Sequence, residues 1–337
     1  YFVYDRANKA VTVRRIENKL GIKGSPTAEL VFNNAPAQLV GDRKLGLIKY
    51  VMSLMNGARL GVGAQSVGLA EAAYREAVKY ANEREQFGKA IINFPAVMEM
   101  LSNMRAKTDA IRTLLYETAR AVDMYKSLEA ISRERKLEAE ERQTLKTYSR
   151  LADALTPMLK LFSSEYANQI TYDCIQVHGG SGFMKDYACE RFYRDARILT
   201  IYEGTSQLQV VAAIRGVVSG AYVGRIKEYE QIEVRDDLKP LRQTLISLRE
   251  EFEKVYEIAK EWGSSSEAFD FNSRRLVEIA GYLVMCNLLV NDANKDAMFT
   301  KSAKIMTKLA ESEIAKAITY IKNFNPEILE DYKNIIA

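Results

Sequence analysis

Histidine and cysteine are scarce in this chain of 337 residues, which has one histidine, His178, and three cysteines. Cys174, Cys189 and Cys286 form no CxxC pair, so the sequence argues against a zinc site of cysteine and histidine ligands, and we expect no metal. Unpaired cysteines fit a reducing compartment. We therefore expect a bacterial cytoplasmic protein, with the mitochondrial matrix as the alternative.

Long apolar runs and an excess of one charge are also missing. The longest uncharged stretches, such as residues 279–291, are shorter than the ~20 residues that span a bilayer, so no transmembrane segment is expected. The 48 basic and 44 acidic residues are dispersed and leave a net charge of +4, which argues against a nucleic-acid partner bound mainly through charge. The chain opens on Tyr1-Phe2-Val3-Tyr4, with neither a starting methionine nor a signal-like segment, and we expect a fragment of a longer protein.

The apolar pattern changes twice along the chain. Residues 1–43 read as short strands separated by turn residues. Helical spacing then predicts helices near 47–82, 95–124, 138–177 and 205–218, whose short connections suggest an antiparallel bundle. Beyond Gly220 three further helical patterns follow, at 232–261, 274–292 and 299–323. Small residues along the first helix, such as Gly57, Gly61 and Gly68, permit close approach of a flat cofactor or, more commonly, of a neighbouring helix.

The segment Ile201-Tyr202-Glu203-Gly204-Thr205-Ser206-Gln207 places a single carboxylate at the start of a predicted helix. No other acid lies between Asp195 and Glu228. If that carboxylate is buried, desolvation opposes its charge and the positive helix end favours it, a balance that suits a base working near neutral pH. The alternative is that Glu203 only caps the helix begun by Thr205 and Ser206.

Two further segments lie at predicted helix ends. In Gln176-Val177-His178-Gly179-Gly180-Ser181-Gly182, three glycines within four positions let a ligand approach the backbone, although a glycine C-cap explains them equally well. In Glu83-Arg84-Glu85-Gln86-Phe87-Gly88, the arginine suits a pyrophosphate and the phenylalanine suits stacking on a flat ring. A plain helix terminus, with Arg84 near its last carbonyls, is the alternative.

Together and in this order, the three segments resemble the acyl-CoA dehydrogenase family, flavoproteins that introduce a double bond between the α and β carbons of an acyl-CoA thioester. The glycine-rich part of the resemblance comprises Gln176, Gly179, Gly180, Gly182, Asp186, Arg191 and Asp195. The resemblance covers about residues 1–218. It implies a mainly α fold in three regions: 1–43 as the end of the middle β domain, 44–220 as the C-terminal FAD-binding four-helix bundle with the catalytic glutamate, and 221–337 as the additional C-terminal helical domain of longer members.

The resemblance also implies FAD as the cofactor and a homodimer. Arg84, Gln86 and Phe87 are expected to contact an FAD held mainly by the partner subunit, which Gln176, Gly179 and Gly180 would approach as well. Thr205 and Gln207 are expected at the FAD held mainly by their own subunit.

For the reaction, the resemblance implies that Glu203 removes the α proton of the acyl-CoA while a hydride passes from the β carbon to flavin N5, giving the trans-2-enoyl-CoA. Electrons would then pass to an electron-transfer flavoprotein, as in fatty acid β-oxidation. Arg59 is expected to orient groups around the base, and the substrate would be contacted by Asn56, Arg59, Tyr202 and Gly204. Ala58 occupies the place where some members carry their base, which closes that alternative.

Two other functions stay open at this stage. An acyl-CoA oxidase shares the fold and the base but lets oxygen reach the reduced flavin. A flavoprotein relative that binds nucleic acid without dehydrogenation would need a concentrated basic surface, which the dispersed charge argues against. His178 lies inside the glycine-rich segment, and we interpret it as a packing residue or a local hydrogen-bond donor.

Overall fold

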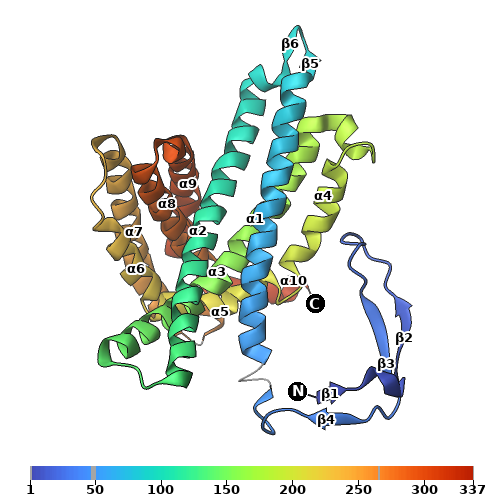
Figure 1. Ribbon diagram of the computed structural model, residues 1–337. Helices are drawn as coiled ribbons and strands as arrows, with labels where there is room; N and C mark the ends of the chain where they lie inside the picture. The colour runs from blue at the N-terminus through green and yellow to red at the C-terminus, as the bar shows by residue number, and fades with distance from the viewer. Residues whose placement is uncertain (1, 47–50, 265, 337) are drawn as a thin grey trace.

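The computed structural model describes residues 2–46, 51–264 and 266–336, and most of them are helical (Figure 1). The first group of helices is α1 (Met52–Glu83), α2 (Pro95–Glu134), α3 (Ala139–His178), α4 (Cys189–Ala196) and α5 (Ser206–Val218). The second group is α6 (Ala221–Glu230), α7 (Lys239–Glu261), α8 (Glu267–Lys295), α9 (Thr300–Lys322) and α10 (Ile328–Ile335). The predicted fold class, mainly α with a partial β region at the start, is confirmed.

The described strands form three separate two-stranded antiparallel sheets. Strand β1 (Phe2–Tyr4) pairs with β4 (Ala37–Leu39), β2 (Val11–Ile16) with β3 (Ala28–Phe32), and β5 (Glu85–Gln86) with β6 (Lys89–Ala90). Strands β1 to β4 lie to one side of the helices in Figure 1. Large apolar side chains on them, such as Phe2 and Phe32, are exposed, so this region builds no core of its own among the described residues.

One turn ties the β region to the helices. Asp195 at the end of α4 accepts a hydrogen bond through Oδ1 from the backbone N–H of Ile22 at 2.5 Å, and Arg194 donates to the carbonyl of Leu20 at 3.0 Å. A Cβ at Gly21 would lie 2.4 Å from the carbonyl oxygen of Arg194, so only glycine permits this close approach. Asp195 of the glycine-rich signature therefore orients the β2–β3 hairpin on the bundle.

Helix α3 lies at the centre of the first group and packs against α1, α2, α4 and α5. A Cβ at Gly63 of α1 would lie 2.7 Å from Leu159 of α3, so the absence of a side chain lets the two helices come together there. Gly57, Gly61 and Gly68 have no neighbouring atom within 4 Å of such a Cβ. The small residues of α1 thus serve helix packing at Gly63 and leave an open surface at the other three positions.

Helix α8 forms the centre of the second group and contacts α7, α9, α6, α2 and α5. The ring of Phe162 on α3 occupies the space that a side chain at Gly281 of α8 would need. Tyr222 of α6 is buried and donates its hydroxyl to the carbonyl of Ala154 at 2.7 Å. One hydrophobic core includes side chains from both groups. The predicted boundary near residue 220 falls between α5 and α6, and the core continues across it.

Some predicted helices have different bounds in the structure. Helix α2 continues to Glu134, α7 begins only at Lys239 with Pro240 in its first turn, and α8 already begins at Glu267. The short helices α4, α6 and α10 were not predicted, because eight to ten residues show too few turns for a clear periodicity. For the first helix, residues 47–50 lie outside the described residues.

Among the described residues, α8 is long and apolar enough to cross a membrane by length and composition. The expectation of no such segment counted only uncharged runs and missed that the helix extends on both sides of residues 279–291. Most of its apolar window is buried inside the protein, and a buried core helix passes the same test.

Candidate functional site

The turn formed by Glu203 and Gly204 has an unusual backbone. Glu203 has a φ of 55° and Gly204 a φ of 95°, so both residues have positive φ just before α5. Such a conformation is strained for glutamate, and strain of this kind persists where the surrounding structure holds it in place. Thr205 is the N-cap of α5, and its side-chain oxygen accepts a hydrogen bond from the N–H of Leu208 at 3.4 Å. The interpretation of Glu203 as the helix cap is therefore wrong.

The Glu203 side chain is half-buried, and its Oε2 atom is buried with no hydrogen-bond partner among the described residues. The neighbouring Tyr202 donates its hydroxyl to Gln65 Oε1 at 2.5 Å. Burial, together with the charge of Glu203, raises the pKa of Tyr202, so that hydroxyl stays protonated. A buried carboxylate oxygen without a partner is unusual in a folded protein and can accept a proton from a bound molecule.

Three side chains from three helices hold the two carbonyl groups of this turn. Arg59 of α1 donates through Nε to the Glu203 carbonyl at 3.2 Å, and through Nη1 to Asn56 Oδ1 at 3.1 Å. Lys160 of α3 donates to the Gly204 carbonyl at 2.7 Å. Gln209 of α5 donates to the Gly204 carbonyl at 3.0 Å. The structure thus brings Arg59 to the Glu203 turn and places Asn56 beside Arg59, and the roles expected for both residues stay predictions.

Lys160 was not identified from the sequence. Its side chain is fully buried in the middle of α3, where Met158, Leu159, Leu161 and Phe162 surround it in the chain. A single lysine inside an apolar run was the available signal, because an ammonium group is rarely buried without a specific partner. Burial and the nearby charge of Arg59 lower the pKa of Lys160 to about 8.

A cavity of about 730 Å³ lies beside the start of α5. Thr205, Ser206 and Gln207 line it together with Arg197, and the Ser206 hydroxyl is buried with no partner among the described residues. A helix N-terminus, a guanidinium group and an unpartnered hydroxyl are groups that bind phosphate oxygens. These groups suit the pyrophosphate of a dinucleotide such as FAD, whereas the carboxylates of Glu165 and Asp173 line the α3 side of the cavity. The roles expected for Thr205 and Gln207 stay predictions.

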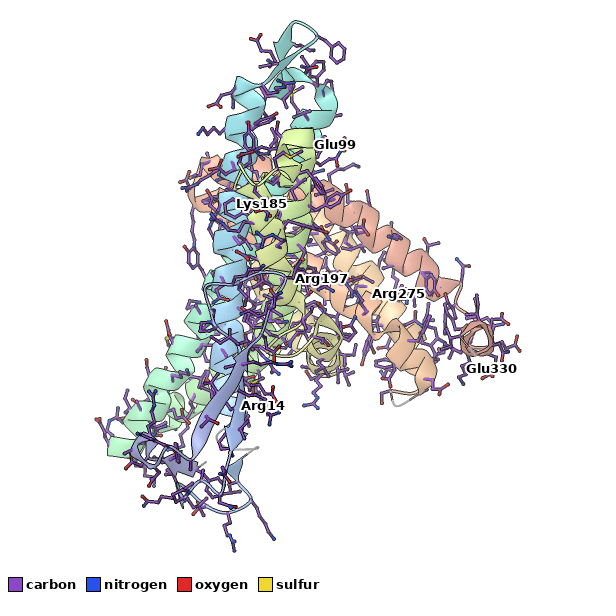
Figure 2. The ribbon with its side chains drawn as sticks, turned by 90° about the vertical axis from the view of Figure 1, so that its right-hand side faces the viewer. Arg14, Glu99, Lys185, Arg197, Arg275 and Glu330 are labelled. Atoms are coloured by element: carbon purple, nitrogen blue, oxygen red, sulfur yellow. The ribbon has the colours of Figure 1, made fainter. Side chains whose placement is uncertain are left out.

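The other expected cofactor residues lie at a different end of the bundle. Arg84, Gln86 and Phe87 are exposed on the β5–β6 hairpin, where Phe87 is 93 % exposed. Gln176, Gly179 and Gly180 are exposed at the end of α3, and a Cβ at either glycine would meet no atom within 4 Å. Figure 2 shows Glu99 and Lys185 toward the hairpin end and Arg197 about midway along the bundle.

Contacts near the helix ends join α1 to the glycine-rich segment. Tyr80 of α1 stacks on His178 with ring centroids 4.3 Å apart and donates to Ser181 Oγ at 3.2 Å. From Lys160 to Gln176 the helix α3 rises by about 24 Å, at 1.5 Å per residue. The cavity beside α5 extends along α3 as far as Asp173, three residues before Gln176, so it approaches the second set of expected cofactor residues.

A second cavity, of about 900 Å³, lies between α1, α3, α5 and α6. Asn56 and Arg59 line it, and three more arginines, Arg150, Arg215 and Arg225, form other parts of its wall. Arg225 is paired with Glu117 at 2.6 Å, whereas Arg150 and Arg215 make no ion pair within the described part of the chain. The lining carries four arginines and two acids, Asp153 and Glu228, so its net positive charge makes this cavity suitable for an anion.

The fold also brings together Cys174, His178 and Cys189, whose possible ligand atoms lie within 4.8 Å of one another. The spacing of these residues along the chain did not indicate this cluster, and the expectation of no metal stays a prediction. Burial raises the pKa of both thiols, which opposes the thiolate form that a metal needs. His178 Nδ1 lies 2.7 Å from the Cys174 carbonyl oxygen, so His178 has the packing and local hydrogen-bond role that was predicted.

Comparison with known proteins adds independent findings. The family model described as acyl-CoA dehydrogenase, C-terminal domain, matches residues 48–217, and that described as acyl-CoA dehydrogenase C terminal matches residues 218–329. The solved structure of an acyl-CoA dehydrogenase from Bacillus anthracis complexed with FAD is similar with a TM-score of 0.76 and 26 % identity, over 98 % of this chain and 60 % of that one.

Two curated proteins are similar in sequence. The acryloyl-CoA reductase (NADH) of Anaerotignum propionicum is 37 % identical over 219 residues, which are 64 % of this chain and 49 % of that protein. A subunit of the caffeyl-CoA reductase–Etf complex of Acetobacterium woodii is 34 % identical over 212 residues, which are 62 % of this chain and 49 % of that protein. The chain thus spans about half the length of these relatives.

Proposed function

The chain belongs to the acyl-CoA dehydrogenase family, and we propose that it is the C-terminal part of an FAD-dependent oxidoreductase. The enzyme would act on the bond between the α and β carbons of an acyl-CoA thioester, with Glu203 as the group that exchanges the α proton. The proposal rests chiefly on one observation. Glu203 combines a strained backbone with a buried carboxylate oxygen that has no partner among the described residues, and residues from three helices hold its turn.

The chemistry requires such a rigid site. An α proton of a thioester is a weak acid, so a carboxylate removes it only if its position is fixed and the negative charge that develops on the thioester oxygen is stabilised. We propose that the backbone N–H of Glu203 donates to that oxygen while the side chain takes the proton. Arg59 holds the Glu203 carbonyl and so keeps the peptide oriented. Bound FAD would supply the acceptor for the hydride that leaves the β carbon.

The second cavity provides a place for the charged part of the substrate. It is bounded by Asn56 and Arg59 beside the Glu203 turn, and it continues to Arg150 and Arg215. We propose that these last two arginines bind phosphate groups of coenzyme A, because a guanidinium group without an ion pair recognises phosphate through paired hydrogen bonds. Tyr202 and Gly204 would lie near the acyl end.

We propose that FAD is bound between two copies of the protein. Thr205 and Gln207 would hold one FAD at the cavity beside α5, and Arg84, Gln86, Phe87, Gln176, Gly179 and Gly180 would contact the FAD of the partner subunit. The exposure of Phe87 and the open space at Gly179 and Gly180 leave this end of the bundle accessible to a second molecule, which supports the arrangement. A full-length protein that is monomeric and yet binds FAD with full affinity would contradict it.

The direction of the reaction and the electron partner are further parts of the proposal. The names of two relatives describe reductases, and one of these relatives is a subunit of a complex with Etf. In the dehydrogenase direction Glu203 accepts the α proton; in the reductase direction the protonated Glu203 returns it. We propose an electron-transfer flavoprotein as the partner in either direction, as in fatty acid β-oxidation for the dehydrogenase. Hydrogen peroxide formed in air without an added acceptor would instead indicate an oxidase.

The central experiment uses the full-length, FAD-loaded protein without oxygen. Acyl-CoAs of graded chain length, including an aryl-substituted propionyl-CoA, are mixed with the protein, and the loss of the oxidised flavin absorbance is followed. Glu203→Gln should keep FAD but react more slowly by roughly 10²- to 10⁴-fold, the usual contribution of a general base.

The matched control is Glu129→Gln, the same change at an exposed position of α2. It should leave the rate unchanged. A Glu203→Gln variant that reacts within tenfold of the unmodified protein would overturn the assignment of the base. Failure of the unmodified protein to react with any acyl-CoA or enoyl-CoA would overturn the proposed activity itself.

A further inference from the structure

Lys160 is the most deeply buried charged group in contact with the Glu203–Gly204 turn. None of its surface is exposed, and its Nζ donates one hydrogen bond, to the Gly204 carbonyl at 2.7 Å. An ammonium group has three donors, and burying it without an ion pair is costly. No ion pair to Lys160 exists among the described residues. The fold therefore retains this lysine at a cost in stability, which points to a role in the site.

The charged groups that act on Lys160 come from three elements. Arg59 on α1 repels it, Glu165 on α3 attracts it, and Glu203 in the turn before α5 attracts it. Gln209 on α5 is neutral and shares the same carbonyl acceptor. The attracting charge outside α3 is thus the carboxylate of Glu203, whose Oε2 is buried with no partner among the described residues.

We propose that Lys160 is a positioning residue, whose ammonium group holds the Gly204 carbonyl and thereby fixes the strained conformation that places the Glu203 carboxylate for proton transfer. This inference rests on the proposed function of Glu203. Arg59 holds the preceding carbonyl from the opposite helix, so a donor on α1 and a donor on α3 fix two consecutive peptide groups. Loss of one donor frees the Gly204 peptide, and misplacing a catalytic group by about 1 Å can cost on the order of 10²-fold in rate.

The charge of Lys160 makes the arrangement sensitive to pH. Its pKa is lowered to about 8 by burial and by Arg59, whereas an unperturbed lysine titrates near 10.4. Below pH 8 the ammonium donates a charge-assisted hydrogen bond to the Gly204 carbonyl. Above pH 8 the neutral amine is a weaker donor, so the turn loses part of its restraint. The rate of the proton-transfer step should therefore fall as the pH rises through about 8.

The kinetic test uses Lys160→Met, which keeps the length of the side chain and removes the charge and the donor. In the full-length FAD-loaded protein we expect this variant to have a kcat lower on the order of 10²-fold, with little change in KM. Its activity should no longer decrease as the pH rises above 8. In a Glu203→Gln background the same change should have little further effect, since the carboxylate to be positioned is gone. Lys146→Met, on an exposed part of the same helix, is the control and should leave both kcat and the pH profile unchanged.

A second measurement needs neither substrate nor turnover. With ¹³C-labelled lysine, the NMR signal that is absent from Lys160→Met, or from Lys160→Arg if the first variant does not fold, reports the titration of Lys160. We expect its midpoint near pH 8 in the unmodified protein and a lower midpoint in Glu203→Gln, because an attracting charge has been removed.

The results separate this inference from the proposed function. A midpoint near 10, or one that Glu203→Gln does not change, would overturn the role of Lys160 even if the enzyme is active. A Lys160→Met variant whose kcat is unaltered, or whose activity still decreases above pH 8, would overturn that role as well. If the unmodified protein reacts with no acyl-CoA, the proposed function fails, and the proton-transfer role of Lys160 fails with it, whereas the titration still shows whether the two charges are coupled.

Discussion

Substitution of Gly281 by alanine tests how the second group of helices is packed on the catalytic bundle. A Cβ at this position would lie 2.0 Å from Cε2 and 2.4 Å from Cζ of Phe162, so the ring on α3 has to move. Overpacking of a buried contact costs about 1–3 kcal/mol. Alanine is also a better helix former than glycine by about 1 kcal/mol, which partly offsets that cost.

The matched control is Gly224→Ala, because Gly224 is also inside a helix, is exposed, and would place a Cβ with no atom within 4 Å of it. It gains the helix preference of about 1 kcal/mol without the clash. The free energy of unfolding of Gly281→Ala should therefore be lower than that of Gly224→Ala by about 1–3 kcal/mol.

Urea unfolding of the FAD-saturated full-length protein, followed by circular dichroism, measures the difference through the transition midpoints. Adding Phe162→Leu to Gly281→Ala should recover part of the loss, since leucine lacks the ring atoms that collide. Equal stability of the two alanine variants, or no recovery in the double variant, would refute the packing argument. The rate of flavin reduction should also fall in Gly281→Ala, because Phe162 lies two residues from Lys160 on α3.

Three further predictions concern the cavities and the helix contacts. Arg150→Gln and Arg215→Gln should each raise KM for acyl-CoA roughly tenfold, because hydrogen bonds to charged groups contribute about 1.5 kcal/mol or more. Neither variant should change KM for an acyl-pantetheine, which lacks the nucleotide phosphates. Thr205→Ala should lower stability by about 1 kcal/mol in thermal unfolding while Thr205→Ser does not, because the hydroxyl caps α5. Burial alone would raise the pKa of Glu117, but its hydrogen bonds from Arg120 and Arg225 outweigh this and lower that pKa below 4.5. The ionised Glu117 therefore stabilises the fold above about pH 4.5, and this stabilisation is lost as the pH falls. Glu117→Gln should destabilise the protein more at pH 7 than at pH 4.

Local sequence was sufficient for the long helices and for most of the candidate site. The periodic patterns predicted α3, α5, α9 and the end of α1 to within a few residues, because apolar residues recur at helical spacing over several turns. Glu203 was identified as the only acid between Asp195 and Glu228, at the start of a predicted helix. Its neighbour Thr205 and the glycines at the end of α3 then indicated the family by their order along the chain.

Other features were decided only when distant segments came together. The cluster of Cys174, His178 and Cys189 depends on the contact between α3 and α4, and no spacing in the sequence predicts it. The arginines of the second cavity lie on α1, α3, α5 and α6, and their convergence depends on how these helices pack. Contacts of this kind join residues far apart in the chain, whereas a periodic pattern reports only on neighbours within a few turns.

The sequence by itself determined the helical class, the family and the position of Glu203, because amphipathic periodicity and short motifs are properties of neighbouring residues. Only the tertiary structure decided what holds Glu203 in its strained conformation. Arg59, Lys160 and Gln209 reach the turn from three helices, and their hydrogen bonds exist because packing of α1, α3 and α5 brings their side chains to the same two carbonyl groups.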